Sequence, residues 1–182
     1  ARFARWQQVC STVATPPRTP YAALLARARS GAPELDEQAV RQVSMDVERT
    51  CPALPFFQKE GGRQMLTNVL EAWVLHDAQR DAVAADREDA SDDAPSASAS
   101  KRVGYVQGMS FIAMNLLWHA GREESVFVIF VAMMQQYGLE SMFEPPDMRG
   151  LRMRAFTVVQ LLRCTMPDLS DHLAEYLQNS LE

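Results

Sequence analysis

Apolar side chains recur at intervals of three and four residues along most of the chain, and this spacing restricts the possible folds more than any other feature. In the best example, the apolar positions would cover one side of a helix: Met65, Leu66, Val69, Leu70, Trp73 and Val74. No stretch shows a convincing alternation of period two, which would indicate strands. The sequence therefore predicts an all-α fold.

Two helix ends can be placed from local signals. A helix is expected to start near Asp36 and to stop by Cys51, because Pro52 disfavours helical geometry in the residue before it. This places Arg49 at the end of a helix. The pair Gly61–Gly62 is expected to break the chain before the next helix.

Residues 77–102 differ in character from their surroundings. Acidic residues cluster between Asp81 and Asp93, and the stretch APSASAS at residues 94–100 offers no large side chain to bury. We expect a disordered, flexible surface insertion that is acidic and rich in Ser and Ala. A solvated linker without a specific function is its simplest interpretation.

Length and composition favour an ordinary soluble globular protein. The 182 residues suit one domain, residues 1–182, with 47% apolar and 23% charged residues. The longest purely apolar run, residues 126–134, is too short to span a membrane. A formal net charge of −5 gives no basic stripe, so we expect no nucleic-acid binding.

The metal-binding and disulfide classes are disfavoured by spacing. The three cysteines are widely separated, and the three histidines show no HxxxH or HExxH spacing. We therefore expect no metal ligand and a reducing, cytoplasmic setting.

Two short segments could carry chemistry: VSMDVERT at residues 43–50 and GYVQGM at residues 104–109. Asp46 and Arg49 would share one helix face, so the carboxylate can hold the guanidinium. Gly104 and Gly108 bracket Gln107 in a pattern typical of a tight, exposed loop. Each residue alone also has a simple structural explanation, because arginine is common in a last helical turn and glutamine in a solvated turn.

Together and in this order, the segments resemble the TBC domain family of Rab GTPase-activating proteins, whose pattern is IxxDxxRT followed by YxQGM. Val43 stands here at the isoleucine position, and Val106 stands where cysteine is frequent. Framework-like segments at residues 66–73, 111–117, 123–127 and 166–173 extend the resemblance over most of the chain. The resemblance implies a TBC-type helical domain in its N-terminal, finger-bearing part, with further helices beyond residue 182.

The resemblance also implies roles for particular residues. Arg49 would stabilise negative charge on the γ-phosphoryl group of GTP bound to a Rab-type GTPase, and Gln107 would orient the attacking water. Asp46 would support the arginine, while Tyr105, Gly108 and Met109 would shape the loop. GTP and Mg²⁺ would arrive with the partner GTPase, so the chain needs no cofactor of its own.

The expected function is therefore GTPase activation in vesicle and membrane traffic, with catalytic groups supplied in trans and no reaction of the chain's own. The protein would be cytoplasmic and peripheral on membranes through its GTPase partner. The main alternative is a non-catalytic TBC-like scaffold that binds a small GTPase or another protein. An unrelated helical enzyme ranks behind both, because the sequence shows no nucleophile–base pair, phosphate loop or metal cluster. The sequence leaves open which Rab is recognised and the oligomeric state.

Overall fold

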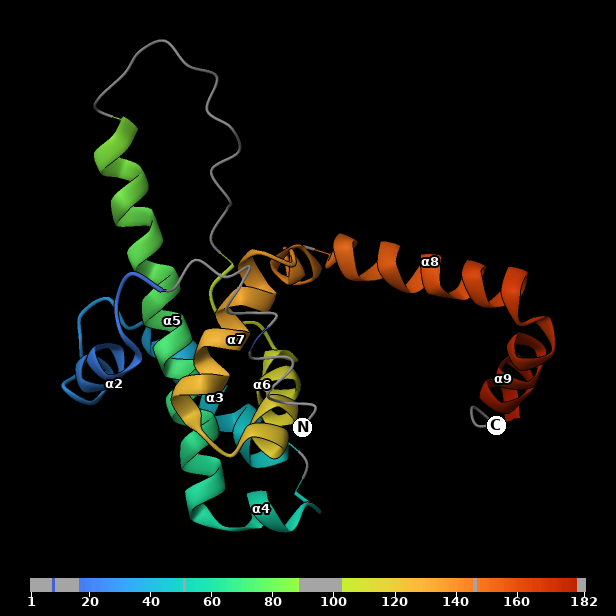
Figure 1. Cartoon of the computed structure of the whole chain (residues 1–182), viewed down its shortest axis with the longest axis horizontal. Helices are drawn as coiled ribbons and strands as arrows, with labels where there is room; N and C mark the ends of the chain where they lie inside the picture. Colours follow the sequence, from blue (N-terminus) through green and yellow to red (C-terminus); the bar gives the residue numbers. More distant parts are fainter. Residues whose placement is uncertain (1–7, 9–16, 51, 89–102, 146, 180–182) are drawn as a thin grey trace. The chain divides into compact units, whose positions relative to one another are not determined.

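The computed structural model describes residues 8, 17–50, 52–88, 103–145 and 147–179. All regular elements among these residues are helices, so the predicted all-α class is confirmed (Figure 1). The chain divides into two compact units, residues 1–138 and 139–182, which are described separately below. That the whole chain forms a single domain stays a prediction.

The first unit is built around one long helix. Its elements are α2 (Tyr21–Arg29), α3 (Glu37–Arg49), α4 (Pro55–Gln58), α5 (Glu60–Glu88), α6 (Met109–Ala120) and α7 (Glu123–Gln135). Each of the other five contacts α5, the long green helix in Figure 1. Because α3 and α6 also contact each other, the arginine segment of α3 lies near the start of α6, which the glutamine loop directly precedes.

The apolar face predicted for residues 65–74 forms the centre of this unit. Leu66, Val69, Leu70, Trp73 and Val74 are all buried. The Trp73 ring meets Phe130 of α7 edge-on, with 5.4 Å between ring centroids. Helix α5 is therefore a core helix, as the apolar spacing predicts.

The expectation that Gly61–Gly62 breaks the chain is wrong. Both glycines lie in the first turn of α5, after the short helix α4. A Cβ atom at Gly62 would lie 2.2 Å from the carbonyl oxygen of Phe56, so a larger residue could not occupy this position without a shift. The glycine is needed for close approach of α4 to α5 rather than for a break.

The expected boundary of the flexible insertion is also wrong. Helix α5 does not end at Asp77 but continues to Glu88. The physical reason is that residues 78–87 contain several alanines together with glutamine and arginine, which are strong helix formers. The helix therefore continues into the acidic stretch that was predicted to be flexible. The remainder of the predicted insertion, residues 89–102, lies outside the described residues.

The second unit contains η1 (Leu139–Met142), α8 (Arg149–Thr165) and α9 (Pro167–Asn179), and α8 contacts both other elements. Its only buried residues among those described are Glu140 and Phe143. Large apolar side chains are exposed along both long helices, including Met153, Phe156, Leu161, Tyr176 and Leu177. No helix of the described part of the chain has the length and apolar character to cross a membrane.

Candidate functional site

Arg49 is the last residue of α3, as the sequence predicts. The helix starts with Asp36 as N-cap, whose carboxylate accepts a hydrogen bond of 2.9 Å from the backbone N–H of Gln38. The Arg49 side chain is 53% exposed and forms an ion pair with Asp46, one turn earlier. The guanidinium is therefore both accessible and held at one end.

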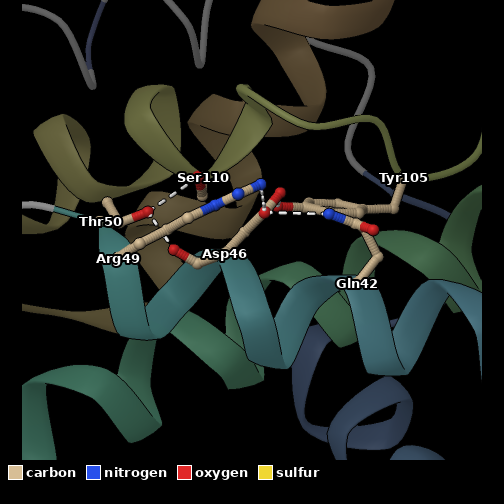
Figure 2. Close-up of polar contacts among 6 residues, drawn as sticks. All are labelled: Gln42, Asp46, Arg49, Thr50, Tyr105 and Ser110. Carbon is tan, nitrogen blue, oxygen red and sulfur yellow. Dashed lines mark hydrogen bonds and ion pairs between the residues drawn. The ribbon is translucent and has the colours of Figure 1, made fainter.

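Asp46 is the centre of the polar contacts at this site, and it is only 1% exposed. Its Oδ1 accepts hydrogen bonds from Nε2 of Gln42, at 3.0 Å, and from the Arg49 guanidinium, while its Oδ2 accepts one from the Tyr105 hydroxyl at 2.8 Å. Figure 2 shows these three groups converging on the carboxylate. A buried carboxylate is costly unless donors surround it, and three donors from two segments meet that need here.

Tyr105 connects the glutamine loop to this carboxylate. Burial raises the pKa of the Tyr105 phenol well above its usual range, and the hydrogen bond to Asp46 raises it further. The phenol therefore stays protonated and remains a donor to Asp46. Because Tyr105 precedes Gln107 by two residues, Asp46 joins the arginine segment to the loop that carries the glutamine.

Thr50 fixes the end of α3 against the start of α6. Its hydroxyl donates to the Asp46 carbonyl oxygen at 2.5 Å and contacts the Ser110 hydroxyl at 3.0 Å, as Figure 2 shows. All three residues are buried. Sequence reasoning missed Gln42, Thr50 and Ser110, although the spacing of Gln42 one turn before Asp46 could have indicated the first of them.

The loop is also held by α5. The backbone N–H of Gly104 donates to Oδ2 of Asp77 at 2.8 Å, and the carbonyl oxygen of Gly104 accepts from the Trp73 indole N–H at 3.0 Å. Neither Asp77 nor Trp73 was predicted to contact the loop. Asp77 lies 27 residues and Trp73 lies 31 residues before Gly104, and nothing in the sequence indicated these contacts.

Gly108 is the N-cap of α6 and has a φ of 103°, a backbone conformation that favours glycine. The next residue, Met109, is fully buried, whereas Gln107 is exposed. Gly108 therefore allows the chain to turn from an exposed glutamine directly into a buried helix. The supporting role expected for Gly108 stays a prediction.

A surface depression of about 580 Å³ lies beside the loop. Its walls come from the first half of α3, from α5 and from the loop: Asp36, Gln38, Ala39, Gln42, Val74, Val103, Gly104, Tyr105, Val106 and Gln107. Gln107 lines this depression, while Arg49 is not among the lining residues. Among the described residues, no group of three or more His, Cys, Asp or Glu side chains is placed to hold a metal ion.

The geometry defines a class of protein: an all-helical domain that exposes an arginine at a helix end and a glutamine on a neighbouring loop. One buried aspartate binds the arginine and the Tyr105 hydroxyl of that loop. The family model described as the Rab-GTPase-TBC domain matches residues 96–181. This span contains the glutamine loop and lies beyond the arginine segment.

Curated proteins extend the similarity towards the N-terminus. The chain is 32% identical over 131 residues to the Caenorhabditis elegans Rab GTPase-activating protein eat-17, a match that covers 71% of this chain and 12% of that protein. It is 28% identical over 169 residues to the human ecotropic viral integration site 5 protein homolog, covering 92% of this chain and 17% of that protein. The GTPase-activating protein GYP5 of Eremothecium gossypii is 29% identical, with 92% of this chain and 16% of that protein covered.

The resemblance to the TBC domain family of Rab GTPase-activating proteins is thereby confirmed. The chain spans less than a fifth of the length of these three relatives.

Proposed function

We propose that the protein activates a Rab-type small GTPase by supplying Arg49 and Gln107 to its GTP site. The observation that carries this proposal is the role of Asp46, which binds both Arg49 and the hydroxyl of Tyr105. An arginine and a water-orienting amide are the two groups that assisted GTP hydrolysis requires. Similarity to relatives named as GTPase activators supports the same conclusion.

In GTP hydrolysis, the chain would contribute only correctly positioned groups and a positive charge. A water would attack the γ-phosphorus, the bond to the β–γ bridging oxygen would break, and GDP and inorganic phosphate would leave with the released proton. Gln107 would orient that water through its amide. The ion pair with Asp46 uses one terminal nitrogen of the Arg49 guanidinium, so the remaining N–H donors can bind phosphate oxygens.

The partner would bring GTP and its Mg²⁺, and the chain would contribute no cofactor. We further infer that the protein works in the cytoplasm, at membranes that carry its GTPase. Its role would then lie in membrane traffic. Similarity to named Rab GTPase-activating proteins supports this setting.

The test is GTP hydrolysis by a panel of Rab proteins with the intact protein and its variants. Arg49→Ala and Gln107→Ala should each lower the stimulated kcat, by about 10³-fold or more for the arginine, while melting temperatures stay close to wild type. Arg49→Lys should not restore activity, because an ammonium lacks the planar fork of the guanidinium. Arg41→Lys, at an exposed position of the same helix, is the matched control and should behave like wild type.

Binding measured beside turnover separates activation from the scaffold alternative. A Rab protein that binds the wild type without faster GTP hydrolysis would favour the scaffold. Equal stimulation by wild type, Arg49→Ala and Gln107→Ala would disprove the catalytic roles.

A further inference from the structure

The loop that carries Gln107 is anchored where it begins. Gly104 is the second described residue after residues 89–102, and both of its backbone polar groups bond to side chains of α5. The N–H donates to Asp77 at 2.8 Å, and the carbonyl oxygen accepts from Trp73 at 3.0 Å. Two bonds from one helix to one peptide segment restrict both the position and the orientation of the loop.

Asp77 is suited to a lasting anchor because it is charged and fully buried. Its Oδ1 pairs with the Arg80 guanidinium at 2.9 Å, which leaves Oδ2 to accept from Gly104. A hydrogen bond to an ionised acceptor is stronger than one between neutral groups. Losing the carboxylate would also leave the Gly104 N–H without this acceptor in a partly buried place.

Trp73 provides the second contact from the core. Its side chain is fully buried and packs edge-on against Phe130 of α7, so the indole has little freedom to move. The donor that meets the Gly104 carbonyl is therefore fixed by the core itself. Residues four positions apart on α5 thus hold the two sides of one glycine.

We propose that Asp77 is a positioning residue for GTPase activation, acting through Gly104 to hold the loop that presents Gln107. This inference rests on the proposed function, because it assigns Asp77 to the same reaction. Asp77 does not touch the partner or the nucleotide. It keeps the loop in the geometry in which the Gln107 amide reaches the attacking water. Trp73 contributes to the same geometry through its hydrogen bond to the Gly104 carbonyl oxygen.

The first experiment measures stimulated GTP hydrolysis with the intact protein carrying Asp77→Ala. A displacement of about 1 Å at a reacting group costs about 10²-fold in rate, so kcat should fall by about that factor, with KM for the Rab protein changed less than threefold, roughly. Asp77→Asn keeps an acceptor for Gly104 and should retain most of the activity. Its Arg80 can turn to solvent, because that side chain is already 26% exposed.

A double-mutant cycle distinguishes positioning from general damage. If Asp77 acts through Gln107, then adding Asp77→Ala to Gln107→Ala should cost less than about threefold more. Asn68→Ala is the matched control, because Asn68 is another buried polar residue of α5, bonded to Glu123 and Gln64 and not to the loop. It should lower stability while leaving kcat near wild type.

Hydrogen exchange gives a readout that needs no GTPase. Amides of residues 103–108 should exchange faster in Asp77→Ala than in Asn68→Ala at equal global stability. Where Asp77→Ala folds poorly, Trp73→Phe removes the indole donor while keeping an aromatic ring in the core, and at matched global stability it should show the same effects in smaller measure. Equal losses of kcat in the wild-type and Gln107→Ala backgrounds would overturn the proposal, as would unchanged loop exchange.

If the wild-type protein stimulated no Rab protein, the proposed function would fail. The exchange comparison would still support or overturn the anchoring role by itself.

Discussion

At the scale of single residues, the buried carboxylate of Asp46 determines how the site is assembled. Donors reach it from one turn earlier on α3, from the end of α3 and from the loop before α6. Each donor offsets part of the cost of burying the charge, so the three groups depend on one another. Removing any one of the three donors should therefore alter how Asp46 holds the Arg49 guanidinium.

The Tyr105 hydroxyl provides the clearest test of this dependence. Tyr105→Phe removes the donor to Oδ2 of Asp46 with little change in shape, leaving a buried carboxylate oxygen without that partner. We expect a loss of about 1–3 kcal/mol in the free energy of unfolding, measured by urea denaturation. Tyr137→Phe, at an exposed position, is the control and should change stability little. Equal stabilities of the two variants would contradict the role given to this hydrogen bond.

At the scale of helices, the sequence predicted the elements better than their ends. The start of α3 near Asp36, its end at Arg49 and the buried face of α5 were all expected from the sequence. The end follows from the proline at position 52, and the buried face follows from apolar spacing. Both predicted ends of α5 were wrong, because the Gly61–Gly62 pair and the acidic stretch were interpreted from composition alone. The contacts of Asp77, Thr50 and Ser110 could not be predicted, since they depend on which helices pack together.

The contact between α5 and α7 contains a titratable group, His76. Its ring is mostly buried, contacts Phe127 edge-on and shares a hydrogen bond of 3.1 Å with Nε2 of Gln135. Burial lowers the pKa of His76 below 6.5, a shift reinforced by Arg80 and opposed by the Gln135 hydrogen bond and Asp77. The folded state therefore prefers the neutral ring.

The sign of the pH effect follows from this preference. Above about pH 6.5 the ring is neutral in both states, and below it the unfolded chain takes up a proton that the folded chain resists. The stability due to His76 is thus present above pH 6.5 and lost as the pH falls towards its folded pKa. Glu71 acts in the opposite direction, because burial raises its pKa and its protonation favours the folded state.

Comparison of two proteins isolates the histidine from Glu71. We expect the stability of wild type relative to His76→Gln to decrease as the pH falls from 7.5 through 6.5 to 5.5, measured by urea unfolding at each pH. Glutamine keeps a partner for Gln135 and does not titrate. Parallel curves for the two proteins would exclude His76 as the source of the pH dependence.

At the scale of the whole chain, the two units differ greatly in how much they bury. All of the candidate site residues and nearly all of the buried apolar side chains lie in residues 1–138. In residues 139–182, Phe143 is the only buried apolar side chain among those described, while both long helices expose large apolar groups. Since packing of an apolar face supplies most helix stability, α8 and α9 have little support within their own unit.

This contrast predicts uneven opening of the 182-residue chain. Backbone amides of α8 and α9 should exchange with deuterium much faster than those of α5, α6 and α7, because local opening there exposes little additional apolar surface. Among the described helices, limited proteolysis should cut within α8 and α9 before it cuts within α5, α6 or α7. Phe57→Ala, which removes a buried ring from the first unit, should by contrast lower its melting temperature strongly, at a cost of about 3–5 kcal/mol. Protection of α8 and α9 equal to that of α5 would show that the second unit is as stably folded as the first.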